Sequence, residues 1–225
     1  RIAVFGDGPL SMQITVAALN AGLAVNWGAR DLETLHDSVE QLADIFAAGV
    51  KGGGLSPEQS QKRLELLRWG GCADMLGDAQ MLVYAGRGYE DVPVRDGVPR
   101  ALATSERVSQ LGLRFAPPVF SSRLVEVIQG PRGTVHHAVY GRALAERLNR
   151  VPVLVRSDGD SIAGRLYAAL HRAADALIDL GADPYDIDHA VEQWGWSRPP
   201  FRARDMAGLV EMARAPRAEG AENWS

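Results

Sequence analysis

Residues 2–11 read I-A-V-F-G-D-G-P-L-S, an apolar run followed by a turn with two glycines and a proline. Apolar residues at helical spacing follow over residues 12–19, and Gly22 ends that segment. The order of strand, glycine turn and helix is typical of the first part of a dinucleotide-binding βαβ unit. There the backbone approaches a pyrophosphate, and the helix N-terminus faces its negative charge.

The turn departs from the G-x-G-x-x-G fingerprint at its third glycine, where Ser11 stands. Serine adds only a hydroxymethyl group at the contact between helix and strand, so the turn is still predicted to bind a dinucleotide. The predicted cofactor contacts in the turn are Gly6, Gly8, Pro9, Leu10 and Ser11. The alternative is a structural tight turn that no longer binds a nucleotide.

The second recognition point of a dinucleotide is the end of the next expected strand, at residues 23–27. An acidic residue about 20 positions after the fingerprint normally holds the ribose hydroxyls. Here that position is Ala29, and Arg30 follows it. A guanidinium without a repelling carboxylate suits a 2′-phosphate, so the predicted cofactor is NAD or NADP, with Arg30 as a contact. The alternative is that Arg30 is a solvated residue at the start of a helix.

The rest of the chain predicts an α/β fold: a Rossmann-type doubly wound sheet with a second, smaller all-helical domain. Strands are expected at residues 81–85, 101–104, 112–115, 124–128 and 151–155, and helices at 32–50, 57–69 and 134–148. Beyond Ser157 the pattern is helical alone, at residues 162–181, 184–194 and after Pro200. We therefore expect a dinucleotide-binding domain at residues 1–156 and a helical domain at 157–225.

Composition disfavours several classes of partner. The net charge of −4, with Lys and Arg spread along the chain, gives no basic stripe for nucleic acid or an anionic membrane. No apolar run approaches the roughly 18 to 20 residues that span a bilayer, and no signal segment is evident, so a cytoplasmic location is predicted. The single cysteine, Cys72, has no Cys or His cluster beside it, so no metal site is expected. A first residue of Arg1 rather than methionine is compatible with a piece of a longer protein.

Residues 113–127 read L-R-F-A-P-P-V-F-S-S-R-L-V-E-V. This stretch is similar to the catalytic strand and the following strand of the NAD-dependent L-3-hydroxyacyl-CoA dehydrogenases, H-F-F-N-P-x-x-x-x-x-L-V-E-V. Further motifs in the same order extend the resemblance from residue 2 to about residue 209. It implies hydride transfer between NAD(P) and the C3 hydroxyl of an acyl-CoA in fatty acid β-oxidation. It also implies a homodimer that forms through the helical domain.

The resemblance places the family's catalytic pair at positions 114 and 126. In the family a histidine acts as the base and a glutamate orients it; here the glutamate is Glu126, but the histidine position holds Arg114. A guanidinium stays protonated and cannot accept the proton of an alcohol at ordinary pH. We expect Arg114 and Glu126 to form an ion pair that keeps the arrangement of the family's catalytic pair as structure. The alternative is that Arg114 polarises a bound carbonyl or binds an acidic group.

The resemblance implies further site residues. Tyr84 stands where the family has a glutamate near the nicotinamide, and Ser105, with Thr104, is the nearest match to a serine element. Lys51 and Lys62 correspond to a helical projection that contacts CoA, although exposed lysines on helices are usually only solvated. About 20 residues of the family's helix and loop have no counterpart on each side of the strand at 101–103.

Two functions therefore stay open at the level of sequence. The first is an oxidoreductase of the 3-hydroxyacyl-CoA dehydrogenase type with an altered catalytic group. The second is a catalytically inactive relative that binds CoA or a dinucleotide, or serves as a scaffold within a larger protein.

Overall fold

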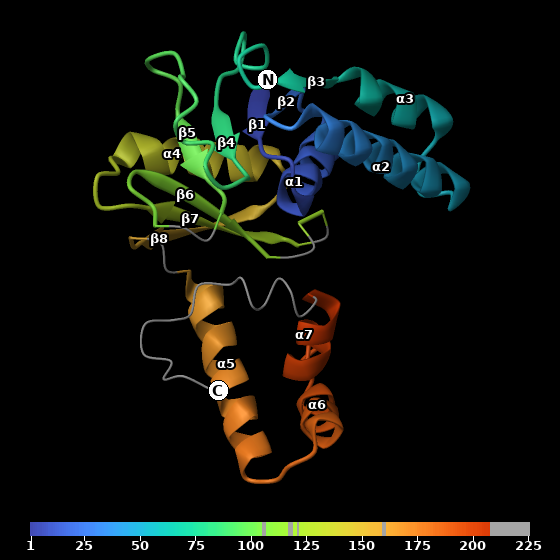
Figure 1. The fold of residues 1–225 in the computed structure, drawn as a ribbon, viewed down its shortest axis with the longest axis vertical. Helices are drawn as coiled ribbons and strands as arrows, with labels where there is room; N and C mark the ends of the chain where they lie inside the picture. The colour runs from blue at the N-terminus through green and yellow to red at the C-terminus, as the bar shows by residue number, and fades with distance from the viewer. Residues whose placement is uncertain (105–106, 117–118, 121, 159–160, 208–225) are drawn as a thin grey trace. The chain divides into compact units, whose positions relative to one another are not determined.

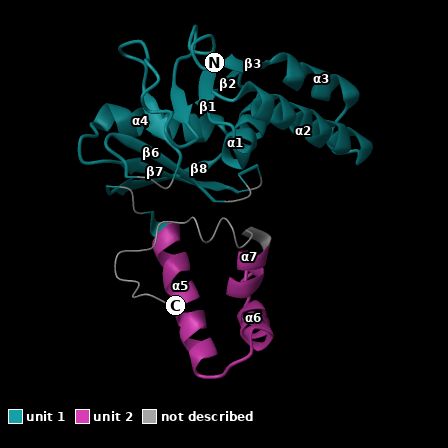
Figure 2. Cartoon of the chain, viewed as in Figure 1, with its two compact units in different colours: residues 1–162 teal, residues 163–225 magenta. Residues whose placement is uncertain are grey.

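The computed structural model describes residues 1–104, 107–116, 119–120, 122–158 and 161–207. The chain forms two compact units, residues 1–162 and 163–225, shown in different colours in Figure 2.

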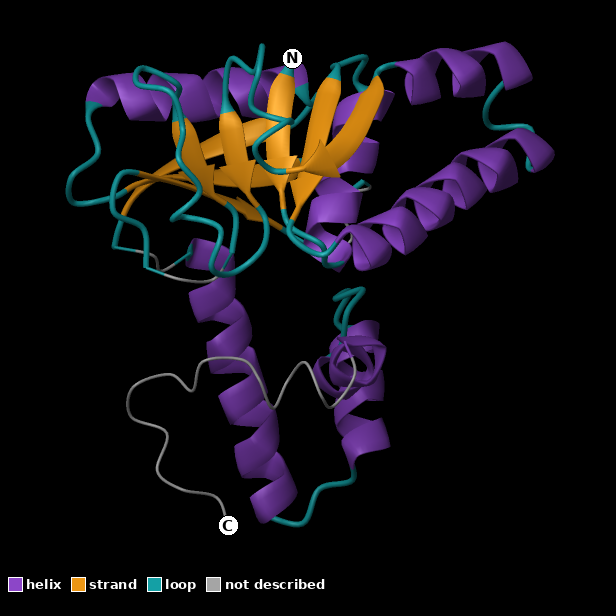
Figure 3. Cartoon of the chain, turned by 45° about the horizontal axis from the view of Figure 1, so that its top comes forward, coloured by secondary structure: helices purple, strands orange, loops and turns teal. Residues whose placement is uncertain are grey.

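The described part of unit 1 contains one eight-stranded sheet with the order β3-β2-β1-β4-β5-β6-β7-β8 (Figure 3). The strands are β1 (Ile2–Phe5), β2 (Val25–Ala29), β3 (Leu67–Gly71), β4 (Leu82–Tyr84), β5 (Arg100–Leu102), β6 (Leu111–Phe115), β7 (Leu124–Gln129) and β8 (Val151–Arg156). Among them β6 and β7 pair antiparallel, while the other neighbours pair parallel. The strand order reverses between β1 and β4, which is where doubly wound sheets bind their ligands. The predicted doubly wound α/β sheet is confirmed.

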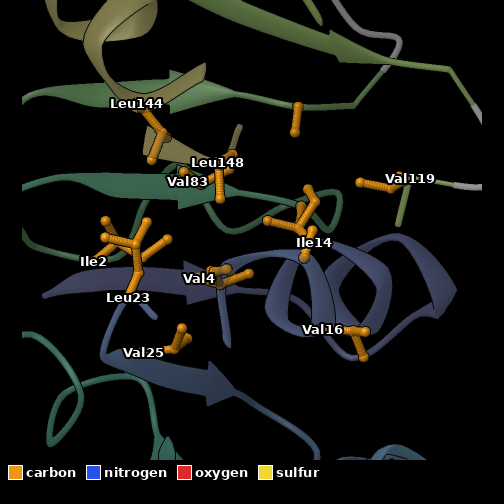
Figure 4. Close-up of a cluster of buried hydrophobic side chains, with 14 of the residues drawn as sticks. Ile2, Val4, Ile14, Val16, Leu23, Val25, Val83, Val119, Leu144 and Leu148 are labelled. Carbon is orange, nitrogen blue, oxygen red and sulfur yellow. The ribbon is translucent and has the colours of Figure 1, made fainter. Parts of the chain in front are cut away.

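Four helices are described in unit 1: α1 (Pro9–Asn20), α2 (Leu32–Lys51), α3 (Pro57–Glu65) and α4 (Val135–Arg147). Ile14 of α1 and Leu144 of α4 belong to the main buried cluster, together with Val4, Val25 and Val83 from three neighbouring strands (Figure 4). Burying such side chains stabilises a fold by about 1.5 to 3 kcal/mol each. The main core therefore holds the two helices against the centre of the sheet and fixes the turn between β1 and α1.

The helix predicted over residues 57–69 is shorter than expected. It ends at Glu65, and residues 67–71 form strand β3 in parallel register with β2, where Trp27 lies opposite Trp69. The apolar residues of this stretch were too few to distinguish one more helical turn from an edge strand, and pairing with β2 favours the strand. The prediction of a helix through Trp69 is wrong, and the sheet gains a strand.

Unit 2 is helical in its described part, with α5 (Ile162–Asp179, whose first residue belongs to unit 1), α6 (Pro184–Gln193) and α7 (Pro200–Ala207). The buried carboxylate of Asp188 in α6 accepts the backbone N–H groups of Phe201 and Arg202 at 2.9 and 2.8 Å, which holds the start of α7. Arg204 of α7 donates two hydrogen bonds to Asp175 of α5, at 2.5 and 2.8 Å. These polar contacts join the three helices into one unit, and the predicted smaller helical domain is confirmed.

Candidate functional site

The glycine turn after β1 is fixed by its backbone neighbours. Gly6 has a φ of +149°, and a Cβ added there would lie 2.8 Å from the nitrogen of Gly86 and 2.9 Å from the carbonyl carbon of Ala85. The indole N–H of Trp27, a buried residue of β2, donates to the carbonyl of Gly6 at 2.8 Å. The turn is thus held from both sides, by β2 and by the end of β4, and only glycine fits at position 6.

Helix α1 begins without a side-chain cap, unlike α2 and α3, which have caps at Asp31 and Ser56. Its N-cap is Gly8, and a Cβ added to Gly8 would meet no atom within 4 Å. Ser11 is fully buried, and its hydroxyl donates to the carbonyl of Gly8 at 2.6 Å, so the missing third glycine is accommodated locally. Pro9 and Leu10 form the first turn of this helix. The open space and the uncapped N-terminus fit the phosphates of a dinucleotide.

The end of β2 is occupied by a side chain from a distant loop. The backbone N–H of Arg30 donates to the hydroxyl of Tyr89 at 3.2 Å, and this hydroxyl donates to the carboxylate of Asp7 at 2.8 Å. The guanidinium of Arg30 lies over the Tyr89 ring, 5.2 Å from its centre, and forms an ion pair with Asp91. Burial raises the pKa of Tyr89 to about 12, so the hydroxyl keeps the proton that it donates to Asp7 to higher pH than an exposed phenol would.

The antiparallel register sets Arg114 of β6 directly opposite Glu126 of β7, so both side chains project from the same face of the sheet. Glu126 is 7% exposed, and its Oε2 accepts the backbone N–H of Ile162, the first residue of α5, at 2.7 Å. Arg114 donates from Nη1 to the carbonyl of Leu102 at the end of β5, at 3.1 Å. Glu126 thereby has a helix-capping partner that the sequence did not indicate.

Tyr84 ends β4 and is 4% exposed. Its ring packs edge-to-face on Phe5, with 6.4 Å between the ring centres, and burial raises the pKa of its hydroxyl. Tyr84 therefore belongs to a second buried cluster, on the sheet face opposite the main core. Thr104 is buried just beyond β5, whereas Ser105 lies outside the described residues.

Lys51 and Lys62 lie on the paired helices α2 and α3, which extend beyond the sheet (Figure 1). Both are exposed, and Lys62 forms an ion pair with Glu58 one turn earlier, at 2.8 Å. A surface pair at this spacing contributes only about 0.3 to 0.5 kcal/mol, so it leaves the ammonium group available to a phosphate.

Within the described residues, no group of three or more His, Cys, Asp or Glu side chains is arranged to hold a metal ion. Cys72 is buried, and burial raises the pKa of its thiol. In the same part of the chain, no helix combines the length and apolar character needed to cross a bilayer.

No family model matches the chain. Over 92% of its length it is 24% identical to the peroxisomal bifunctional enzyme of Danio rerio, of which it spans 31%. The structure of (S)-3-hydroxybutyryl-CoA dehydrogenase PaaH1 from Ralstonia eutropha matches 95% of the chain and 84% of its own length, with a TM-score of 0.82 and 21% identity. The fold is that of the 3-hydroxyacyl-CoA dehydrogenases.

The resemblance found in the sequence is thus confirmed. The same fold also occurs in an NAD⁺-dependent dismutase, a 5-formyl-3-hydroxy-2-methylpyridine 4-carboxylic acid 5-dehydrogenase, with a TM-score of 0.72 and 20% identity over 95% of this chain. The chain spans about a third or less of the length of the curated relatives first found.

Sequence reasoning missed the residues that surround the end of β2 in this dehydrogenase fold. Asp7, Tyr89 and Asp91 were not among the predicted site residues, although they contact the glycine turn or Arg30. One signal was available: Tyr89 is an aromatic residue within a glycine-rich, charged loop directly after a strand that ends at the ligand-binding edge.

Proposed function

We propose that this chain is an oxidoreductase module of the 3-hydroxyacyl-CoA dehydrogenase type. It would transfer hydride between NAD(P) and C3 of an acyl-CoA, as part of fatty acid β-oxidation. The observation that carries the proposal is the common edge of the sheet. The glycine turn after β1 and the opposed positions 114 and 126 lie at the edge where the parallel strands β1 to β6 end, and position 126 is near the start of the antiparallel strand β7.

The glycine turn supports the cofactor assignment. The space at Gly8 and the uncapped start of α1 suit the phosphates of NAD or NADP, and Arg30, directly after β2, is the proposed contact of a 2′-phosphate. When bound, the nicotinamide would supply or accept the hydride. Lys51 and Lys62 remain the proposed partners of a CoA phosphate.

Arg114 can act on the substrate oxygen without serving as an acid or a base. It can donate a hydrogen bond to a ketone oxygen and stabilise the negative charge that develops there as hydride reaches C3, while solvent would supply the proton that completes the hydroxyl. Glu126, buried opposite Arg114, would orient the guanidinium.

A specific observation favours a second candidate, a module that binds acyl-CoA or a dinucleotide without transferring hydride. Glu126 accepts the first N–H of α5, and Arg114 donates to the carbonyl of Leu102. These structural contacts would preserve both residues in a protein that had lost the reaction.

The proposal extends to assembly. Leu180, Tyr185 and Trp194 of unit 2 are each more than 80% exposed, which supports a homodimer through the helical domain, residues 157–225. The cytoplasmic location stays a prediction, because the relatives include peroxisomal enzymes.

The decisive test is the reduction of acetoacetyl-CoA with NADH and with NADPH, followed by loss of nicotinamide absorbance. We expect turnover by the wild type and a loss of about 10²- to 10³-fold in Arg114→Ala. Arg142→Ala, which removes an exposed arginine of α4, is the matched control and should retain the activity. A wild type that is inactive with both cofactors, together with activity gained in Arg114→His, would establish the second candidate instead.

A further inference from the structure

The loop between β4 and β5 places one buried aromatic ring beside the glycine turn. Tyr89 is 3% exposed, although its neighbours Gly88 and Glu90 are exposed. Its ring belongs to the second buried cluster, with Phe5 and Cys72 among the members. Packing as well as hydrogen bonding therefore fixes this ring.

The ring lies where β1 and β4 separate. A Cβ added to Gly86 would be 2.8 Å from Cε2 of Tyr89 and 2.9 Å from the Cα of Gly6. The tyrosine thus covers the backbone of the turn at the topological switch point, which is where doubly wound sheets place a nucleotide.

The Tyr89 hydroxyl lies between the two segments that flank the adenosine ribose in a dinucleotide-binding sheet. There the ribose lies between the glycine turn and the end of β2, and a carboxylate at the end of β2 normally accepts from its hydroxyl; in this chain that position is Ala29. The Tyr89 hydroxyl donates to Asp7 in the glycine turn and accepts from the N–H of Arg30 after β2. The phosphates of a dinucleotide fit the turn, whereas Tyr89 lies between the turn and the end of β2, where the adenosine ribose binds in this fold.

We propose that Tyr89 occupies the adenosine-ribose subsite and sets the affinity for the cofactor, because a dinucleotide binds only after Tyr89 leaves. The loop between β4 and β5 can move without disrupting a helix or a strand, because residues 85–99 form neither. Gly88 and Gly97 adopt φ values of +74° and +83° within it, a conformation in which glycine gives the backbone its widest freedom. This inference rests on the proposed function only for the identity of the ligand.

Asp91, on the same loop, would compete with the 2′-phosphate of a ligand for Arg30. Its carboxylate forms an ion pair with the guanidinium, so closure of the loop neutralises the cation suited to a 2′-phosphate. Release of the loop frees Arg30 at the same time as the ribose subsite. A ligand with a 2′-phosphate therefore competes with Asp91 as well as with Tyr89.

Calorimetric titration of the full chain with ADP-ribose, 2′-phospho-ADP-ribose and inorganic pyrophosphate tests the proposal. Tyr89→Phe keeps the ring but removes both hydrogen bonds, so ADP-ribose should bind about tenfold more tightly than to the wild type. Tyr89→Ala should bind ADP-ribose more tightly than Tyr89→Phe does. Pyrophosphate has no ribose, so it should bind with equal affinity to the wild type, Tyr89→Phe and Tyr89→Ala. Tyr140→Phe is the control, because Tyr140 lies on α4, near the amino ends of β5 and β6.

Equal affinity of the wild type and Tyr89→Phe for ADP-ribose, with equal melting temperatures, would overturn the proposal. So would the absence of ADP-ribose binding by every variant that melts cooperatively. Failure of the proposed function gives a different result: tighter ADP-ribose binding by Tyr89→Phe, with no reduction of acetoacetyl-CoA by any variant. Tyr89→Phe keeps the experiment decisive even where Tyr89→Ala fails to fold.

Discussion

The glycine turn after β1 and the strand pair β6–β7 form parts of the same sheet edge, but they differ from the dehydrogenase pattern in opposite ways. At the turn, Gly6 is kept, and the one altered residue, Ser11, bonds to the backbone of Gly8. At the strand pair the register is kept, with position 114 opposite 126, but the side chain at 114 has changed from a base to a permanent cation.

The difference shows how strongly the fold constrains the residue type in each region. Gly6 lies against the backbone of Ala85 and Gly86, directly after β4, so a larger residue there must displace main-chain atoms, which a packed core resists. Arg114 is only partly buried near the end of a strand, and its substitution leaves the ladder between β6 and β7 intact. A substitution at position 114 can therefore change the catalytic chemistry at little cost to stability. A substitution at position 6 cannot, because it disrupts the turn.

The largest effect is expected from Gly6→Ala. The added Cβ would lie 2.8 Å from the nitrogen of Gly86, and alanine at a φ of +149° is strained, so the free energy of unfolding should fall by about 3 to 5 kcal/mol. Urea denaturation followed by circular dichroism measures this change.

Gly8→Ala is the matched control, because the same methyl group there meets no atom within 4 Å. Its backbone is extended, with a φ of −98°, so stability should stay within about 1 kcal/mol of the wild type. ADP-ribose should nevertheless bind more weakly, since the methyl group takes space that the phosphates need. Equal destabilisation by the two substitutions would show that the turn is not held by β4.

Much of the fold could be predicted because its signals are local. The apolar run before Gly6 and the helical periodicity after Gly8 identified the first strand, turn and helix. The edge strand β3 could not be predicted, because its formation depends on pairing with β2, a contact across about 40 residues of sequence.

The site was less predictable, because it too depends on contacts between residues that are far apart in the sequence. The opposition of Arg114 and Glu126 followed from a family pattern, and the register agrees with it. The capping of α5 by Glu126 and the contact between Tyr89 and Asp7 join residues 36 and 82 positions apart, and neither leaves a periodic trace in the sequence. Both contacts depend on how distant segments pack in three dimensions.

A smaller effect is expected at the strand pair from Glu126→Ala. The substitution removes the acceptor of the Ile162 N–H, so the free energy of unfolding should fall by about 2 kcal/mol. Glu126→Gln keeps a carbonyl acceptor for this N–H, so its free energy of unfolding should fall by about half as much as that of Glu126→Ala. Glu146→Ala, which removes an exposed ion pair with Arg142, is the control and should cost less than about 0.5 kcal/mol. Thermal unfolding of the three variants would contradict the capping role if Glu126→Ala matched Glu146→Ala.

The smallest effect concerns the alkaline stability of the glycine-turn region. Burial raises the pKa of Tyr89 to about 12 from an ordinary value near 10. Between these pH values the unfolded chain loses the phenolic proton while the folded chain keeps it, so stability falls as pH rises through this window. In Tyr89→Phe that contribution is absent, and the free energy of unfolding, measured by urea denaturation from pH 9 to pH 11, should decline less steeply than in the wild type or in Tyr140→Phe. Parallel declines in all three proteins would mean that the Tyr89 hydroxyl titrates like an exposed phenol, and hence that the loop does not hold it against the turn.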